Sequence, residues 1–482
     1  MIYTSDRHKR VKNTGEIFTA PLFIQDMIKN LKNIKDLSKL DKSETWLDPT
    51  CGTGNFLVEL SNFTSYQNLY GVDLMEDNVA ITIERLYNIY KTDNKIENDK
   101  ILKTLKNNIQ QGDAISFNYS KISKNKFDNI VGNPPYNGKI VKNSSIYGEI
   151  IVNAAKFLKD NGKMAMLHPG LWRLKKGNKK LHDFYKSHSV KVKTHDTYFS
   201  RYIWNIVSDI DEIYLTKNNI SKLEINFECI PINGKDNNYK ECNDKFEDVT
   251  EWFEKYPIPT RNFDIFQKFI KTDESQESFP KIIKVNKDIA PKNIQKNKDN
   301  VFKYPVVQKI LKEKRFHEGL FYTDSKPDYQ PKLILSWGSL HNLLDIKGEY
   351  QAKASGNFYL YDTPERLEEL YEVLDDPVFK RLMITFHGGD QKIIIDQRFK
   401  NLHLFTYFKR DFIYEWKKIK KERNLKEDYF FHKVSIIKKS KKYDNYVYIA
   451  KQGLTWEDNE KYFNKTLKIK WYNKEKKEIN ER

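Results

Sequence analysis

The stretch FDNIVGNPPY, from Phe127 to Tyr136, decides the fold of the first half of this chain. Its first part, residues 127–131, is mostly apolar and predicts a short buried strand. The strand must end at the two prolines, because proline has no backbone N–H and is excluded from the interior of a sheet. Asn133 is thereby presented at the carboxyl end of a strand, the edge at which open α/β sheets bind ligands.

The polar end of this stretch suits attack by a weakly nucleophilic planar amine. The Asn133 side-chain oxygen and the Pro134 carbonyl could each accept one N–H hydrogen bond, which frees the nitrogen lone pair. The two prolines hold these acceptors in place, and the Tyr136 ring offers a face for stacking a flat substrate. We therefore predict four catalytic residues, Asn133, Pro134, Pro135 and Tyr136. The structural alternative is a Pro-Pro turn with a capping asparagine.

A second motif, DPTCGTG, runs from Asp48 to Gly54. Its surroundings predict a strand, a glycine turn and a helix across residues 44–60. Gly52 and Gly54 permit positive φ and close approach of a ligand, while Asp48 can receive a cationic amine. The third glycine of a dinucleotide loop and the Lys-Ser/Thr of a phosphate loop are missing from the motif. The loop therefore favours a zwitterionic amino-acid cofactor such as S-adenosylmethionine over NAD or ATP.

Acidic residues end the next two predicted strands. Asp73 follows the apolar run 68–72, about 20 residues beyond the glycine turn, where a carboxylate can bind ribose hydroxyls. Asp113 ends a strand that starts at Ile109 and could accept from an exocyclic adenine amine. A helix is predicted between them, from Glu76 to Tyr90. Acids after strands often only cap turns, but four polar strand ends in one alternating β/α series indicate a binding edge.

Two further segments belong to the same predicted domain. Thr19 is predicted to be the N-cap of an amphipathic helix with Pro21 in its first turn, and this helix start could receive a carboxylate. A capped helix without a ligand is the alternative. After the catalytic stretch, a helix from Ile146 to Leu158, with Gly162 at its C′ position, leads into a buried strand.

Together these motifs resemble the N6-adenine-specific DNA methyltransferases of the γ motif order, a group found in type II restriction-modification systems and phages. The resemblance covers roughly the first 215 residues, and Asn133-Pro134-Pro135-Tyr136 matches the NPPY motif of the family letter for letter. It implies a doubly wound, Rossmann-like α/β domain that uses S-adenosylmethionine, followed by an α+β target-recognition domain. The cofactor-binding residues that it implies are Thr19, Asp48, Pro49, Cys51, Gly52, Gly54, Asp73, Asp113 and Asn133.

The resemblance also implies that the target adenine is flipped out of duplex DNA and methylated at N6. In this family an aromatic residue after the catalytic motif stacks on the far face of the base. Phe199, Tyr202 and Trp204 compete for this role; we favour Trp204, which leads most directly into the last strand pair. Core aromatics of a β-hairpin are the alternative reading for each of the three.

Charge and composition suggest the partner. The chain has 84 Lys and Arg residues against 66 Asp and Glu, a net charge of +18, which favours a polyanion such as double-stranded DNA. A Lys-rich compositional bias is the alternative explanation. Residues 409–442 interleave lysines with aromatics, as phosphate contacts and base stacking require. We predict a catalytic domain over residues 1–235 and a basic DNA target-recognition domain over 236–482, divided at a polar, Asn-rich segment.

The remaining features concern context. Three cysteines, Cys51, Cys229 and Cys242, match no zinc spacing, and we expect no metal. No signal peptide or membrane-spanning run is evident, so we expect a cytoplasmic protein of a bacterium or a phage-infected cell. No nuclease signature is evident either, so any cognate restriction endonuclease would be encoded separately. The alternatives are an RNA-adenine or protein-glutamine methyltransferase, which share NPPY, and a DNA-binding protein that has lost catalysis.

Overall fold

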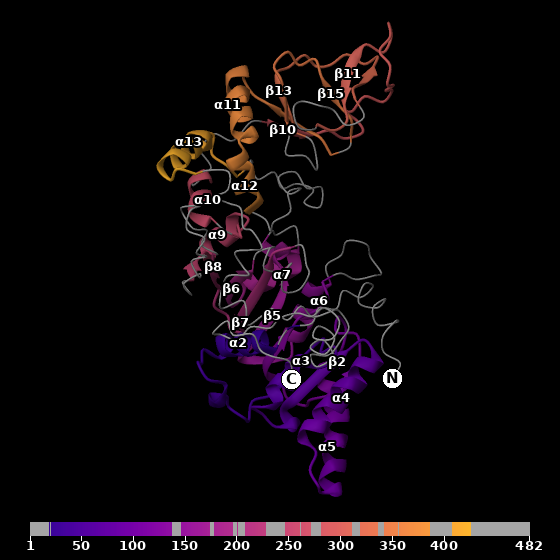
Figure 1. Cartoon of the computed structure of the whole chain (residues 1–482), viewed down its shortest axis with the longest axis vertical. Coiled ribbons are helices and arrows are strands. Elements are labelled where there is room, and N and C mark those ends of the chain that lie inside the picture. The colour runs from indigo at the N-terminus through magenta and orange to yellow at the C-terminus, as the bar shows by residue number, and fades with distance from the viewer. Residues whose placement is uncertain are drawn as a thin grey trace, which may run out of the picture. The chain divides into compact units, whose positions relative to one another are not determined.

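The computed structural model (Figure 1) describes residues 19, 21–136, 146–173, 178–195, 200, 208–227, 246–260, 262–270, 281–310, 319–335, 342–354, 356–385 and 407–425. Within these ranges the chain forms two compact units, the first running through Ile258 and the second beginning at Pro259. The predicted domain boundary after residue 235 lies outside the described residues.

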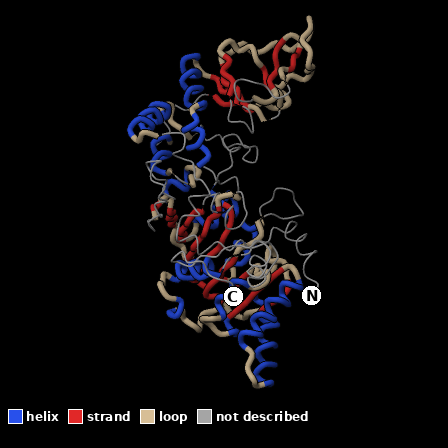
Figure 2. Tube along the Cα trace, viewed as in Figure 1, coloured by secondary structure: helices blue, strands red, loops and turns tan. Residues whose placement is uncertain are grey.

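One sheet organises the described part of the first unit (Figure 2). Its strands are β1 (Trp46–Asp48), β2 (Leu69–Asp73), β3 (Ile109–Gln111), β4 (Phe127–Gly132), β5 (Leu158–Pro169), β6 (Ser189–His195), β7 (Ile210–Thr216), β8 (Lys222–Asn226) and β9 (Glu247–Asp248). They lie in the order β3-β2-β1-β4-β5-β7-β6-β8-β9. Strands β1 to β5 are parallel, and β7 is antiparallel to both of its neighbours. The predicted doubly wound, Rossmann-like α/β fold is confirmed.

Helices cover both faces of this sheet. They are α2 (Pro21–Lys32), α3 (Asn55–Ser61), α4 (Glu76–Tyr90), α5 (Lys95–Asn108), α6 (Tyr147–Ala155), α7 (Lys179–Lys186) and α9 (Thr250–Lys255). Val131 and Ala165, on adjacent strands, join the core cluster formed with residues of α2 to α5. Their chain neighbours Ile130 and Met164 point to the opposite face and are equally buried. Both faces are therefore apolar and covered, as a parallel sheet requires.

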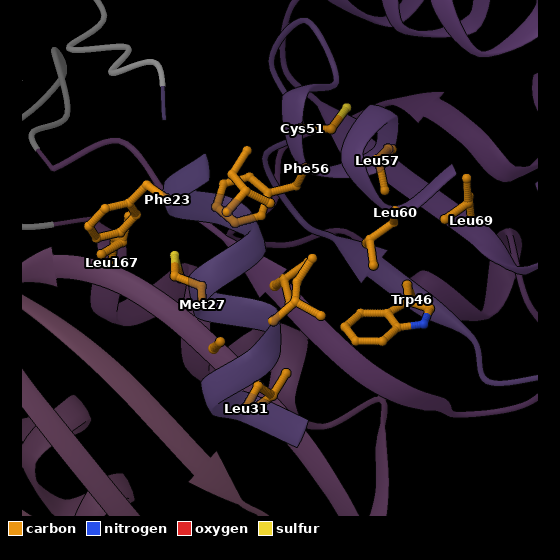
Figure 3. Packing of buried hydrophobic residues seen from close by; sticks show 14 of the residues in the cluster. Phe23, Met27, Leu31, Trp46, Cys51, Phe56, Leu57, Leu60, Leu69 and Leu167 are labelled. Atoms are coloured by element: carbon orange, nitrogen blue, oxygen red, sulfur yellow. The ribbon is translucent and has the colours of Figure 1, made fainter. Parts of the chain in front are cut away.

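One face of helix α2 packs into the core of the first unit and holds the helix in place. Phe23, Met27 and Leu31 recur every four residues, so they share one face and point into the core (Figure 3). There they join Trp46 of β1 and Phe56 of α3, and none of the five side chains is more than 6% exposed. This packing fixes the start of α2, and with it Thr19, near the ends of the central strands.

Some predicted boundaries for this unit are wrong. The helix predicted to reach Leu158 ends at Ala155, and Gly162 is no C′ residue because it lies within β5. Asn161 takes a left-handed conformation (φ 59°) beside it, where the pairing of β4 with β5 shifts register, so a bulge supplies this turn. Helix α2 begins at Pro21, which leaves Thr19 one residue outside the N-cap position. Helix α5 was not predicted, because its sequence is dominated by Lys and Asn.

The second unit is α+β, as predicted. Its described strands form a sheet of order β10-β16-β13-β14 and a smaller sheet of order β12-β11-β15. These strands are β10 (Lys281–Lys284), β11 (Tyr304–Val307), β12 (Phe321–Thr323), β13 (Lys332–Leu335), β14 (Asn342–Asp345), β15 (Gln351–Ala352) and β16 (Phe358–Tyr361). The helices are α10 (Phe263–Phe269), α11 (Pro364–Asp375), α12 (Pro377–Thr385) and α13 (Phe412–Glu422).

Candidate active site

The polar residues predicted at strand ends lie along one edge of the sheet. Asp48 ends β1 and Asp73 ends β2, while Asp113 follows β3 and Asn133 follows β4. These four strands are adjacent and parallel, so their carboxyl ends share an edge. The strand order reverses between β1 and β4, which places Asp48 and Asn133 at the switch point where open α/β sheets form a ligand crevice.

The glycine loop between β1 and α3 is held from one side and open on the other. The Thr82 hydroxyl of α4 donates to the Gly52 carbonyl (3.0 Å), and Arg85 donates to the Thr53 carbonyl (2.7 Å). Gly54 has φ +86°, and a Cβ there would lie 2.7 Å from the Thr82 Cγ2. Gly52 has φ +54°, and no heavy atom of the described chain comes within 4 Å of its Cβ position. The loop backbone at Gly52 is therefore open to a ligand.

Asp73 has a second role that its position in the sequence did not reveal. Its Oδ2 accepts the Gly52 N–H (2.8 Å), while Oδ1 accepts from the Met75 N–H (2.9 Å) and the Asn78 side chain (3.0 Å). Burial raises the pKa of Asp73. The carboxylate thus fixes the glycine loop, and its oxygens keep lone pairs for further donors such as ribose hydroxyls.

Asp48 is buried beside β4, the strand that leads to Asn133. Its Oδ1 accepts the Thr50 N–H (3.0 Å), and a Cβ at Gly132 of β4 would lie 2.9 Å from the same oxygen. Burial, followed by the charge of Asp73, raises the pKa of Asp48 to about 8. An approaching ammonium would favour the ionised carboxylate, so binding of a cation at this site would be coupled to release of a proton.

Asp113 lies in an exposed turn. Its Oδ1 accepts the Ile115 N–H (3.0 Å), and the residue is exposed. The ring of Phe117 covers the backbone before it, since a Cβ at Gly112 would collide with that ring. Asn153 of α6 donates to the Phe117 carbonyl (3.0 Å) and holds this turn. An aromatic ring therefore lies beside Asp113, with the Lys121 Nζ 6.0 Å from its centroid, and this ring was not predicted.

Asn133 is held at both ends of its amide. Its Nδ2 donates to the Thr19 hydroxyl (3.2 Å), and its Oδ1 accepts the Tyr136 hydroxyl (3.0 Å). Thr19 is 3% exposed, and its carbonyl accepts from Asn55 of α3 (3.4 Å). Tyr136 is 8% exposed, and burial raises the pKa of its hydroxyl. The structure thus brings Thr19, helix α3 after the glycine loop and the NPPY motif together. The Tyr136 ring is buried in this arrangement.

Further aromatic rings pack next to Tyr136. Tyr147 meets its ring edge-on at 6.4 Å and stacks on His168 at 4.8 Å. The His168 Nδ1 faces the Pro169 carbonyl (3.0 Å), so Nδ1 carries the proton and Nε2 accepts the Tyr185 hydroxyl (2.7 Å). Burial lowers the pKa of His168 to about 4, which keeps the ring neutral. Tyr147 thus lies between the rings of Tyr136 and His168.

A buried ion pair closes the same sheet edge beyond β5. The Arg173 guanidinium donates Nε to Asp211 Oδ2 (2.9 Å) and Nη2 to Asp211 Oδ1 (2.7 Å). The Trp172 indole also donates to Asp211 (2.7 Å), and the Thr194 hydroxyl donates to its other oxygen (3.1 Å). Although burial raises it, the Arg173 charge holds the pKa of Asp211 below its usual value. The pair spans 38 positions in sequence, so local spacing gave no signal for it.

The remaining residues named in the sequence analysis lie partly outside the described part of the chain. The three competing aromatics, Phe199, Tyr202 and Trp204, lie outside the described residues, as do Cys229 and Cys242. Pro134 and Pro135 are described and end β4 as predicted. Within the described ranges, no cluster of three or more His, Cys, Asp or Glu could hold a metal ion. No described helix has the length and apolar character needed to cross a bilayer.

Comparison with known proteins relates part of this region to a family of methylases. The family described as Eco57I restriction-modification methylase matches residues 67–200, which include β2 to β5 and the NPPY motif. The type II methyltransferase M.VspI of Vibrio sp. (strain 343) is 32% identical over 143 residues. That alignment covers 29% of this chain and 30% of the relative.

Solved structures show a more distant likeness. A type I restriction-modification methyltransferase subunit from Streptococcus thermophilus is 17% identical with a TM-score of 0.33, over 43% of this chain and 46% of that one. A putative class I S-adenosylmethionine-dependent methyltransferase from Listeria monocytogenes is 12% identical with a TM-score of 0.28, over 42% and 63%.

Proposed function

Residues 67–200 match the Eco57I restriction-modification methylase family, and on this likeness we propose that the chain methylates the N6 amine of adenine in DNA. The observation that carries the proposal is the shared sheet edge. The glycine loop after β1 and Asn133 after β4 lie on adjacent strand ends, as a cofactor and its methyl acceptor require.

The residues of this edge fit S-adenosylmethionine. Asp48 would receive the ammonium group, the open backbone at Gly52 would lie against the cofactor, and Asp73 would bind ribose hydroxyls. Asp113 and the Phe117 ring would hold adenine, one by hydrogen bonding and the other by stacking. The cofactor, when bound, supplies an electrophilic methyl group on a sulfonium.

The chain's own part in the reaction is to orient and polarise the amine. The Asn133 Oδ1 and the Pro134 carbonyl would accept the two N6 hydrogens, which moves the nitrogen toward tetrahedral geometry and frees its lone pair. Proline fixes the backbone that carries both acceptors, so they need no reorganisation. Because adenine N6 is paired inside a duplex, the base must be flipped out, and Tyr136 and Trp204 are proposed to stack on it.

We further propose that the second unit, within residues 236–482, reads the DNA sequence. Its partner is double-stranded DNA, and a cognate endonuclease would be a separate chain. The excess of basic residues supports a polyanionic substrate. The bacterial cytoplasm, or that of a phage-infected cell, is where such DNA would be met.

The test is methyl transfer from labelled S-adenosylmethionine to mixed-sequence duplex DNA, with Asn133→Ala as the matched variant. We expect N6-methyladenine in one sequence context, detected by mass spectrometry and single-molecule sequencing, and its loss in the variant. Transfer to single-stranded transcripts or to protein glutamine instead would contradict the proposal, as would cofactor binding without transfer to any DNA.

A further inference from the structure

The hydrogen bond between Thr19 and Asn133 raises a question about the direction of the Asn133 amide. Hydroxyl groups lie at both of its ends, Thr19 Oγ1 at 3.2 Å from Nδ2 and Tyr136 Oη at 3.0 Å from Oδ1. A hydroxyl can donate or accept, so two hydroxyls alone permit either orientation of the amide. Only one orientation presents an oxygen to the substrate amine. A ligand that fixes the role of one of these hydroxyls would therefore favour one orientation of the amide.

Thr19 is placed where a ligand can do this. It is 3% exposed and lies two residues before the start of α2, and its carbonyl accepts from Asn55 in the helix of the glycine loop. It thus touches both the cofactor side and the catalytic side of the site. A carboxylate accepts hydrogen bonds and donates none, so a carboxylate beside Thr19 would take the hydroxyl proton. The Thr19 oxygen would then have only lone pairs to offer Asn133, and would accept from Nδ2.

We infer that Thr19 is a positioning residue, through which the carboxylate of the bound cofactor fixes the Asn133 amide with its oxygen toward the substrate. The inference rests on the proposed function, from which it takes the identity of the cofactor. Cofactor and catalytic asparagine are therefore coupled: each stabilises the Thr19 hydroxyl orientation that the other needs. Sequence spacing does not reveal this link, since the two residues are 114 positions apart.

The decisive experiment is a double-mutant cycle on cofactor affinity, which needs no methyl acceptor. Calorimetry measures S-adenosylmethionine binding to the full chain and to Asn133→Asp, Thr19→Val and the double variant. An aspartate would accept the Thr19 hydroxyl proton and compete with the cofactor carboxylate. We expect Asn133→Asp to weaken binding at least threefold more when Thr19 is present than when it is valine. Effects equal within twofold in the two backgrounds would overturn the inference.

A rate measurement separates positioning from simple binding. At saturating cofactor, Thr19→Val should lower the single-turnover transfer rate about fivefold, the value of one lost hydrogen bond to the productive amide orientation. Thr19→Ser retains the hydroxyl and should restore the rate. Thr104→Val is the matched control, because the Thr104 hydroxyl bonds only its own helix at the Lys100 carbonyl (2.9 Å) among the contacts described.

The outcomes distinguish the two proposals. An unmodified chain that binds cofactor with the expected coupling but methylates no DNA would contradict the proposed function and support the role of Thr19. A chain that methylates DNA while the affinity cycle shows no coupling would support the proposed function and contradict the role of Thr19. A chain that binds no S-adenosylmethionine would overturn both.

Discussion

The Tyr136 hydroxyl donates a hydrogen bond to the Asn133 Oδ1 (3.0 Å), so the first and last residues of the NPPY motif are bonded to each other. The oxygen that would polarise the substrate amine is the one that accepts this bond. The Tyr136 ring is 8% exposed in the same arrangement and packs edge-on against Tyr147. A target base that stacks on Tyr136 must rotate this ring outward, and the rotation would release the Asn133 oxygen at the moment it is needed.

Tyr136→Phe tests this exchange. Phenylalanine keeps the stacking face and removes the competing donor, so the base no longer has to replace a hydrogen bond worth about 1 kcal/mol. We expect the KM for DNA to fall by up to about fivefold with kcat retained, while Tyr136→Ala should lose at least about a hundredfold in kcat/KM, since the stacking face is gone. Steady-state kinetics on a methylatable duplex measures both. A Tyr136→Phe variant with a higher KM and a lower kcat would show that the hydroxyl itself serves the bound base.

The raised pKa of Asp48 predicts a pH effect on stability. Its pKa is about 8 in the folded chain against 3.8 in the unfolded chain, so the folded state holds a proton that the unfolded state loses. This contribution is fully present below pH 4 and is lost as pH rises through 8. Asp48→Asn keeps an acceptor for the Thr50 N–H and cannot ionise. We expect its thermal stability, relative to the unmodified chain, to rise between pH 5 and 8, measured without cofactor.

The same variant should bind S-adenosylmethionine more weakly, because the ammonium group loses its carboxylate partner. In the unmodified chain, binding near pH 7 should release a proton, which appears as a buffer-dependent enthalpy in calorimetry. An enthalpy that is independent of the buffer would contradict an ammonium contact at Asp48.

The two loop glycines should respond differently to alanine. Gly54→Ala places a Cβ 2.7 Å from Thr82 Cγ2 at φ +86°, so we expect a stability loss of about 2–3 kcal/mol from strain and crowding together. Gly52→Ala meets open space at φ +54° and should cost only about 1–2 kcal/mol. Its methyl group occupies the ligand side, however, so cofactor affinity should fall more than stability. Urea unfolding and calorimetry give the two quantities, and equal stability losses would contradict this reading of the loop.

The positions of many candidate-site residues in the fold could be predicted, because each lies in a local sequence pattern. The loop from Asp48 to Gly54 and the run into Asn133 each combine an apolar strand with a turn signal, so sequence and position at the sheet edge coincide. Helix α4 has the predicted bounds, Glu76–Tyr90, because its apolar residues keep helical spacing. In the second unit, Thr363 is the N-cap of α11, and its hydroxyl accepts the Arg366 N–H, a local signal of the same kind.

The remainder depends on contacts between distant residues. Thr19 reaches Asn133 only after α2 packs on the sheet, and Phe117 covers Gly112 only through the fold of one turn. Gly162 illustrates the opposite error: a glycine after a helix usually marks its end, but here the helix is shorter and β5 begins before the glycine. The pairing of β4 with β5, and not the local sequence around Gly162, decides the structure there.

The buried pair of Arg173 and Asp211 provides the last prediction. Both side chains are 0% exposed, and Asp211 accepts from Arg173, Trp172 and Thr194. Asp211→Asn keeps the shape and leaves the guanidinium without its charge partner, so we expect a loss of about 3–5 kcal/mol in the free energy of unfolding at pH 7. The pKa of Asp211 is depressed, so this stability is present above the unfolded pKa and is lost as pH falls through the folded value. The variant should therefore approach the unmodified chain at low pH. Urea unfolding at pH 7 and in acid checks both expectations, and a loss that persists undiminished in acid would mean that it comes from packing and not from the ion pair.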